Sequence, residues 1–218
     1  MSSSGGSREE ILGRIRRATE SAVPDPAASY AALQRYYVRV GRVGVDERVA
    51  LMIERMREYD AEVVETAPES LPETIAAQLA ASGRHTFVAP EGLPATWMPA
   101  GFEWMIDRGL STGEIEKADG VVTAAFCGIA DSGTIVLHHS AAEGRRVISL
   151  LPDWHLCVLR ASDVVETLPE YFARCTKAPG LATYISGPSA TADIEMTRIK
   201  GVHGPRFLHL IFVRDERA

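Results

Sequence analysis

The chain has 218 residues, of which 46% are hydrophobic, and a formal net charge of −6 at pH 7. This length fits one α/β domain with a substantial core, and no apolar run approaches the ~20 residues needed to cross a bilayer. The acidic balance does not favour a nucleic-acid-binding protein, because phosphate binding draws on clustered lysine and arginine.

The first 44 residues predict an arm that is separate from the main domain. Residues 1–7 are small and polar and lack the apolar core of a secretion signal, so we expect a cytosolic protein. Residues 8–21 carry apolar side chains at helical spacing, and residues 28–40 are rich in aromatic side chains. We therefore expect a helical and aromatic arm at 1–44 that packs on the core or on a partner, and one α/β domain at 45–218.

In the first half of this domain, helical and strand patterns alternate along the chain. The spacing of apolar residues predicts helices at 46–59 and 70–82, and short apolar runs predict strands at 62–65 and 85–89. Such alternation favours a parallel or mixed sheet covered by helices. The expected fold class is therefore α/β, with a mixed, mostly parallel sheet flanked by helices.

The second half differs, because several strand-like runs follow one another with short polar gaps. No helix fits between the first four of these runs, so part of the sheet is expected to be antiparallel. The expected strands are 120–127, 133–138, 147–151, 156–159, 182–186 and 207–213, and the expected helices are 162–175 and 191–200.

The first candidate binding segment is the glycine-rich stretch 128–134, which lies between two apolar strands. Its two glycines allow the backbone to turn sharply and approach a ligand, while its hydroxyl and N–H groups suit a carboxylate or phosphate. Asp131 can order the loop or bind a ligand hydroxyl. The alternative is a plain hairpin turn, for which Asp-Ser-Gly is suitable chemistry. The candidate ligand-binding residues here are Gly128, Ala130, Asp131, Ser132, Gly133 and Thr134.

The second candidate segment is the turn at Gly187-Pro188 and the helix expected after it. A helix N-terminus has unpaired N–H groups and partial positive charge, which attract anions. In open α/β sheets ligands gather at the carboxyl ends of the strands, where we expect this turn to lie. The alternative is that Ser189 or Thr191 only caps the helix and that Asp193 complements its dipole.

A tight loop follows this expected helix at Gly201-Val202-His203-Gly204-Pro205-Arg206. His203 can titrate near neutrality, and Arg206 can hold a carboxylate or phosphate. His155, which opens a strand, is the other candidate for acid–base chemistry, although a loop histidine is more often structural than catalytic. The candidate catalytic residues are His203, His155, Asp193 and Glu195; the ligand-binding residues of this half are Gly187, Pro188, Ser189, Thr191, Gly201, Gly204 and Arg206.

The sequence offers little support for a metal site. Cys127, Cys157 and Cys175 are far apart and form no C-x-x-C pair, so we expect neither an iron–sulfur cluster nor a structural zinc site in this chain. His138 and His139 are adjacent on an expected strand, and their side chains should point to opposite faces. No metal ligand is assigned, and no cofactor is identified.

In order and spacing, these motifs resemble the LUD-domain family, and within it the lactate-utilisation protein C type. The resemblance spans about residues 45–213 and is carried by Gly128–Leu137, by Leu150-Leu151-Pro152 with His155, and by Gly187–Glu195 followed by Gly201–Pro205. Ala190 departs from the pattern, because a basic residue is expected there in many relatives; an anionic ligand at that point would be held differently.

The resemblance implies a fold like that of ribose-5-phosphate isomerase and the CoA transferases (NagB/RpiA/CoA-transferase-like). It also implies a role in oxidising L-lactate to pyruvate together with two partner proteins that carry iron–sulfur clusters, with this chain as the member that has none. Whether this chain is itself an enzyme is left open by the resemblance.

Three hypotheses follow. The first is a component of a cytosolic L-lactate utilisation system that binds a small anion. The second is a free-standing enzyme acting on a phosphorylated sugar or an acyl-CoA, argued from fold analogy alone. The third is a non-catalytic interaction subunit in which the glycine loops are structural. The first requires that the turn around residue 130 and the segment around residue 190 face each other across one cleft.

Overall fold

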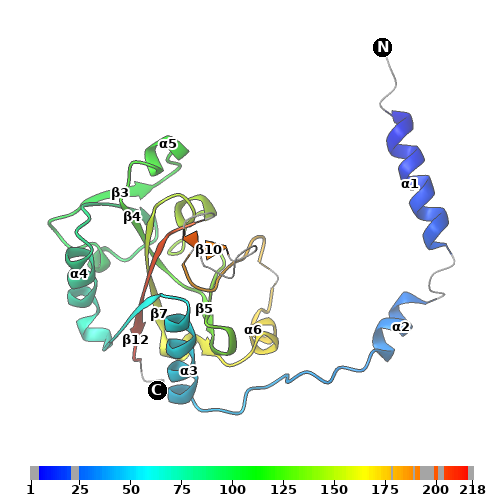
Figure 1. Cartoon of the computed structure of the whole chain (residues 1–218), viewed down its shortest axis with the longest axis horizontal. Helices are drawn as coiled ribbons and strands as arrows, with labels where there is room; N and C mark the ends of the chain where they lie inside the picture. The colour runs from blue at the N-terminus through cyan, green and yellow to red at the C-terminus, as the bar shows by residue number, and fades with distance from the viewer. Residues whose placement is uncertain are drawn as a thin grey trace. The chain divides into compact units, whose positions relative to one another are not determined.

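A computed structural model describes residues 5–20, 25–177, 179–188, 190–191, 199–200 and 204–215 (Figure 1). The chain divides into two compact units, Met1–Tyr37 and Val38–Ala218. The first unit contains α1 (Gly5–Thr19), which confirms the first expected helix, and α2 (Pro26–Ala32). Asp25 caps α2 by accepting hydrogen bonds from two backbone N–H groups of its first turn. The arm boundary at residue 44 stays a prediction.

The second unit is built around a six-stranded sheet in the order β1–β12–β7–β4–β2–β3. Every neighbouring pair in this sheet is parallel. The central strands are buried on both faces, which is why they read as continuous apolar runs in the sequence. The strands are β1 (Glu62–Thr66), β2 (Thr86–Pro90), β3 (Glu103–Asp107), β4 (Gly120–Ala124), β7 (Trp154–Arg160) and β12 (Phe207–Val213).

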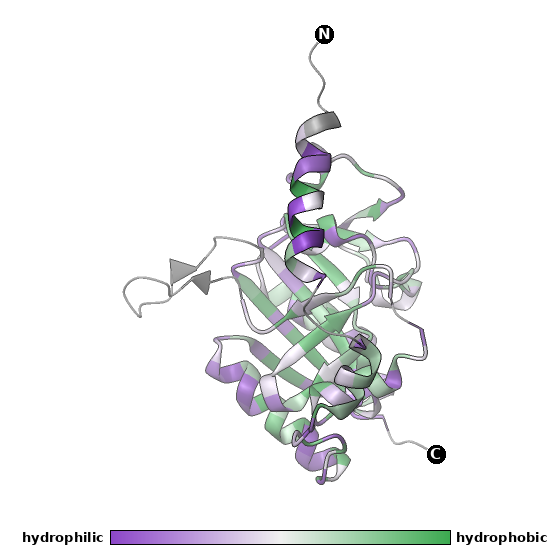
Figure 2. Cartoon of the chain, turned by 90° about the vertical axis from the view of Figure 1, so that its right-hand side faces the viewer, coloured by the Kyte–Doolittle hydropathy of each residue, from purple (hydrophilic) through white to green (hydrophobic). Residues whose placement is uncertain are grey.

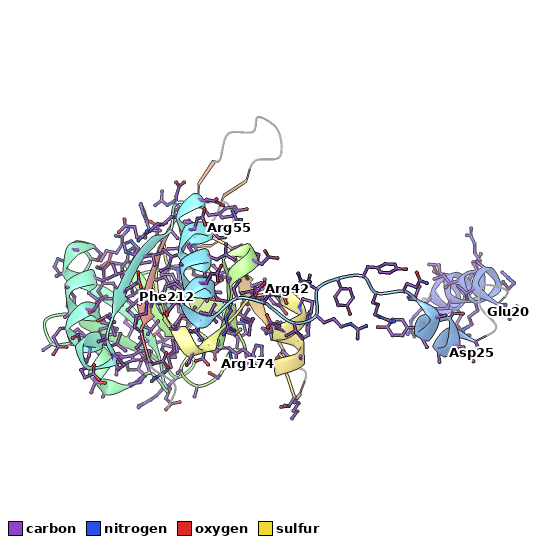
Figure 3. All side chains as sticks on the ribbon, turned by 90° about the horizontal axis from the view of Figure 1, so that it is seen from below. Glu20, Asp25, Arg42, Arg55, Arg174 and Phe212 are labelled. Atoms are coloured by element: carbon purple, nitrogen blue, oxygen red, sulfur yellow. The ribbon has the colours of Figure 1, made fainter. Side chains whose placement is uncertain are left out.

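Two long helices cover the opposite faces of this sheet. On one face, Met52 of α3 (Val45–Glu58) packs in the same cluster as Cys157 of β7. On the other face, Ile75 of α4 (Leu71–Ala81) packs with Leu156 of the same strand. Phe212 of β12 belongs to the α3 cluster and lies inside the body (Figure 3). Figure 2 shows the apolar strands enclosed by helices that turn polar residues outward.

A second, four-stranded sheet packs on the same face as α3 and has the order β8–β5–β6–β9. Its β5–β6 and β6–β9 pairs are antiparallel, as expected for this half of the chain, and β5–β8 is parallel. Short helices α5 and α6 each begin with a capping box. These elements are β5 (Cys127–Ile129), β6 (Thr134–Leu137), β8 (Val164–Val165), β9 (Thr183–Ile185), α5 (Thr112–Ile115) and α6 (Leu168–Arg174).

The expected fold class is confirmed, while several expected elements were wrong. Residues 147–151, expected as a strand, belong largely to a 3-10 turn, η4 (Arg146–Ser149). The helix expected at 162–175 begins only at Leu168, because Val164–Val165 pairs with β5. The helix expected at 191–200 is replaced at its described ends by two antiparallel strands, β10 (Ala190–Thr191) and β11 (Ile199–Lys200).

Two further differences concern the path of the chain. The strand expected at 120–127 is divided after Ala124, because the chain leaves the parallel sheet there and enters the second sheet as β5. Strand β3 and helix α5 had not been expected. Within the described part of the chain, no helix is long and apolar enough to cross a membrane.

Candidate functional site

The first candidate segment forms the turn of the β5–β6 hairpin, through the 3-10 turn η3 (Ala130–Ser132). Gly133 ends this turn with a left-handed φ of 58°, and a Cβ atom there would lie 2.7 Å from Cβ of Arg55 on α3 (Figure 3). A Cβ at Gly128 would lie 2.5 Å from Sδ of Met52. The glycines therefore allow α3 to approach closely, and Gly128, Ala130 and Gly133 are buried beneath it. This packing matches the alternative interpretation of residues 128–134 as a plain hairpin turn.

The side chains of the hairpin turn nevertheless connect the two candidate segments. Ser132 Oγ lies 2.7 Å from Thr134 Oγ1, which in turn lies 2.7 Å from Oγ of Ser186, the residue before Gly187. These three hydroxyl groups line a shallow cavity of about 250 Å³. Its other lining residues are Ile129, Asp131, Leu168 and Tyr184.

A second cavity of about 250 Å³ lies where β9 ends and where β7 and β12 begin. It brings together His155, Gly187, Pro188 and Gly204, which the sequence had nominated from separate segments. Because β7 and β12 begin here, the cavity lies at the amino ends of the parallel strands. The expectation that the turn at Gly187 lies at their carboxyl ends was wrong. The remaining lining residues are Arg146, Ser149, Leu150, Thr183, Tyr184, Ile185, Ser186, Pro205 and Leu208.

His155 is a buried polar residue of this cavity, as is Ser149. Its Nε2 lies 2.8 Å from Oγ1 of Thr123, which also donates a hydrogen bond to Sγ of Cys157 at 3.7 Å. Nδ1 is buried and has no hydrogen-bond partner among the described residues. Burial lowers the pKa of His155 to about 4, so the imidazole is neutral near pH 7. In this state the ring serves as a hydrogen-bonding group.

The cationic candidate of the cavity is Arg146, a residue that the sequence analysis missed. Arg206, which had been nominated, donates two hydrogen bonds to Asp153 outside the cavity, one of them 2.9 Å from Nη2 to Oδ2. Arg145 is held by Asp107, with 2.8 Å between Nε and Oδ2. Arg146 lines the cavity, and nothing in the described part of the chain pairs with its guanidinium. The sequence feature that could have pointed to Arg146 is its position just before the Leu150-Leu151-Pro152 segment, which carries part of the family resemblance.

Several nominated residues lie outside the described residues: Ser189, Asp193, Glu195, Gly201 and His203. Thr191 is described only as backbone of β10. Their proposed roles stay predictions. Gly187 and Gly204 have φ angles of 94° and 117°, which favour glycine. A Cβ at Gly187 would also lie 2.6 Å from Cβ of Tyr59, so this turn packs closely against the chain after α3.

The two adjacent histidines that follow β6 have separate partners. His138 Nε2 lies 2.8 Å from the hydroxyl of Tyr171. His139 contacts the carbonyl oxygen of Gly144 through Nδ1 and Oγ1 of Thr183 through Nε2, each at 2.8 Å. Across the residues that the structure describes, no group of three or more His, Cys, Asp or Glu side chains is arranged to hold a metal ion.

A larger cavity of about 680 Å³ lies between the start of α3 and the carboxyl ends of β7 and β12. Each of its charged side chains has at least one partner inside the protein, although Nε of Arg48 is buried and has no hydrogen-bond partner among the described residues. Arg174 pairs with Asp163, Arg48 donates to the carbonyl oxygen of Val164, and Asp215 accepts two hydrogen bonds from Ser162. The cavity at His155 is better suited to a small anion, because no group among the described residues pairs with the guanidinium of Arg146, whereas Arg48 and Arg174 of the larger cavity each bind another group of the protein.

Comparisons with known proteins place these features in a family. The LUD domain model matches residues 31–213. Lactate utilization protein C of Deinococcus radiodurans is 39% identical over 164 residues, which cover 73% of this chain and 76% of that protein. Lactate utilization protein C of Bacillus subtilis is 29% identical over 228 residues, which cover 94% of this chain and 92% of that protein. The crystal structure of a DUF162 family protein from Deinococcus radiodurans is similar to this chain, with 30% sequence identity and a TM-score of 0.65. The match covers 79% of this chain and 100% of that chain.

Proposed function

The chain belongs to the LUD domain family, and from this membership and the geometry at His155 we propose that it is a component of L-lactate utilisation that binds a small carboxylate. The names of its relatives, lactate utilization protein C, support the pathway. The single observation that supports the binding site is the presence of Arg146 and the neutral His155 in one cavity.

Arg146 is the group that we propose to hold the carboxylate. A guanidinium can donate two parallel hydrogen bonds to a carboxylate, which fixes both the charge and the orientation of the ligand. His155 contributes a neutral hydrogen-bonding group at the wall of the same cavity. We propose Ser186 as a further polar contact, since its hydroxyl continues the series from Ser132 and Thr134.

The size of the cavity supports a small acid as the ligand. Pockets for drug-sized ligands usually measure about 300–1,000 Å³. The cavity at His155 has about 250 Å³, which suits a three-carbon acid better than an acyl-CoA or a nucleotide. This argues against the free-standing acyl-CoA enzyme as far as this cavity is concerned.

The finer parts of the proposal concern location and partners. We propose that the protein acts in the cytosol beside two proteins that carry iron–sulfur clusters, as its resemblance to the family implies. In that arrangement the clusters of the partners would supply the redox chemistry of lactate oxidation, while this chain holds the carboxylate. Recovery of such partners with the full chain from cells grown on lactate would support the arrangement, and their consistent absence would contradict it.

The binding proposal is tested by calorimetry on the full chain with L-lactate and pyruvate as separate probes. We expect Arg146→Gln to weaken binding of whichever acid binds by about tenfold or more, because a hydrogen bond to a charged group contributes about 1.5–3 kcal/mol. Arg160→Gln is the matched control, since Arg160 pairs with Asp215 at the other end of β7.

Arg206→Gln completes the comparison, because the sequence alone had nominated Arg206 as the anion-binding residue. On our proposal its replacement breaks only the pair with Asp153 at the surface. Loss of binding in Arg206→Gln but not in Arg146→Gln would show that Arg206, the residue nominated from sequence, binds the anion and that Arg146 does not. No binding of either acid to the unmodified chain would reject the proposed function.

A further inference from the structure

We infer that His139 is a positioning residue of the proposed carboxylate site, because its ring joins the segment that leads to Arg146 with strand β9. The inference rests on the proposed function, since it requires that a small carboxylate binds at Arg146. It goes further by assigning a role to a histidine that the sequence analysis had considered only as a metal ligand.

The imidazole of His139 contacts two segments that both reach the cavity at His155. Nδ1 lies 2.8 Å from the carbonyl oxygen of Gly144, two residues before Arg146, and Nε2 lies 2.8 Å from Oγ1 of Thr183 on β9. Arg146 and Thr183 are both lining residues of the cavity. His139 therefore links the backbone just before the cationic side chain to a strand that forms another part of the cavity wall.

The partners of the ring determine how this link is made. A carbonyl oxygen can only accept a hydrogen bond, so Nδ1 of His139 carries a hydrogen and donates it to Gly144. In the neutral ring Nε2 then accepts a hydrogen bond from the hydroxyl of Thr183, and in the charged ring it donates to the oxygen of that hydroxyl. Because a threonine hydroxyl can do either, the link exists in both protonation states of the ring.

The backbone of His139 is independent evidence that this position is constrained. Its φ of 58° lies in the left-handed region, which residues other than glycine rarely adopt and which persists only where the surroundings enforce it. Glu143 is a buried part of these surroundings. Its carboxylate accepts hydrogen bonds from the backbone N–H of His138 and from Oγ of Ser140, the latter at 2.6 Å. The loop thus holds the ring of His139 in the direction of its two partners.

The same loop fixes the backbone that leads to Arg146. Gly144 is held by His139, and Arg145 is held by Asp107, with 2.8 Å between Nε and Oδ2. The chain is therefore anchored at both of the residues that precede Arg146. A guanidinium forms two parallel hydrogen bonds to a carboxylate only in a narrow range of orientations, so groups that fix its backbone leave less disorder to be lost on binding. Loss of the His139 link should weaken binding without removing a charge from the cavity.

The inference is tested by calorimetry on the full chain, with L-lactate and pyruvate as separate probes. Glycine adopts a left-handed φ without strain, so His139→Gly removes the ring and retains the backbone conformation. We expect this variant to bind the acid about fivefold more weakly, because it loses hydrogen bonds of ordinary strength. Asp60→Gly is the matched control and should bind like the unmodified chain. Asp60 also has a left-handed φ, of 63°, and it does not line the cavity.

A double-mutant cycle distinguishes positioning from a purely structural role. Thr183→Val removes the hydroxyl partner of the ring, and Thr183→Ser retains it. We expect Thr183→Val to weaken binding, Thr183→Ser to bind like the unmodified chain, and the double variant of His139→Gly with Thr183→Val to bind about as weakly as either single variant. If His139→Gly fails to fold, His139→Asn takes its place in the cycle, since asparagine also tolerates a left-handed φ and has a shorter side chain.

The outcomes separate this inference from the proposed function. If neither acid binds to the unmodified chain, the proposed function fails, and this inference fails with it. If an acid binds and Arg146→Gln weakens it while His139→Gly does not, the carboxylate site stands and the positioning role of His139 is overturned. If the effects of His139→Gly and Thr183→Val multiply in the double variant, the two side chains act separately, which also overturns the inference.

Discussion

At the scale of single residues, the burial of His155 has a consequence for stability as well as for binding. Its pKa is about 4 in the folded chain, compared with about 6.5 for a solvated histidine, because burial disfavours the charged ring. The unfolded chain therefore binds a proton more readily below pH 6.5. The contribution of the neutral ring to stability is complete above this pH and is lost as the pH falls toward 4.

We therefore predict that the free energy of unfolding declines between pH 6.5 and pH 4, with up to about 3 kcal/mol attributable to His155. Urea denaturation at a series of pH values measures this dependence. His155→Gln should flatten it, while His85→Gln, at an exposed position, should not. Burial also lowers the pKa values of His138 and His209, so some slope should remain. An identical slope in His155→Gln and the unmodified chain would contradict the prediction.

The residues of the site show how far single positions can be read from sequence. His155, Gly187 and Gly204 were recognisable because a histidine opening a strand and glycines in turns have local signals. Arg146 was missed, because the sequence does not reveal which of two adjacent arginines is already paired with a carboxylate. The contact of His155 with Thr123 was also missed, because it forms between neighbouring strands.

At the scale of elements, the packing of the β5–β6 hairpin on α3 depends on a glycine at the turn. Gly133 has a left-handed φ of 58°, and an added Cβ would lie 2.7 Å from Cβ and 3.1 Å from the carbonyl carbon of Arg55. Neither the turn nor the helix backbone can move easily without disturbing the cluster around Met52. We predict that Gly133→Ala destabilises the chain by about 2 kcal/mol or more.

Gly113 provides the matched control for this prediction. It lies in α5, and a Cβ atom there would meet nothing within 4 Å. Gly113→Ala should therefore leave stability within about 1 kcal/mol of the unmodified chain or raise it slightly, because alanine is the better helix former. Thermal unfolding of both variants measures the difference. Equal stability in the two variants would mean that the turn tolerates a side chain and that its glycine serves another purpose.

The elements that were predicted correctly are those with long periodic patterns. Helices α3 and α4 and strand β12 had unambiguous spacing or continuous apolar runs. Short apolar runs were less informative, because a run such as 147–151 fits a strand as well as a buried turn. The strand β8 has only two residues, and its pairing with β5 is a tertiary contact that local periodicity does not encode.

At the scale of the whole molecule, the site depends on a meeting of three distant segments. The starts of β7 and β12 and the end of β9 form the cavity at His155. Sequence patterns identified these strands but not the end of the sheet at which the turn at Gly187 would lie. The rule that ligands bind at carboxyl ends applies to a single open sheet. Here a second sheet packs on the first and brings β9 to the opposite end.

The division into two units leads to a prediction about the arm. The buried residues that form the hydrophobic clusters all lie between Val49 and Val213, within the second unit. In the first unit Ile11, Ile15 and Tyr30 are each more than half exposed. A chain that begins at Val38 should therefore fold, unfold within a few degrees of the full chain, and bind the same small carboxylate.

The same truncation tests whether the arm docks on another protein, a role that exposed apolar residues at helical spacing would suit. We expect the chain from Val38 to bind its carboxylate normally but to recover less of any iron–sulfur partner than the full chain does in a pull-down from lactate-grown cells. Partner recovery that is equal for both chains would place docking on the second unit. Loss of carboxylate binding by the truncated chain would show that the cavity at His155 requires residues of the first unit.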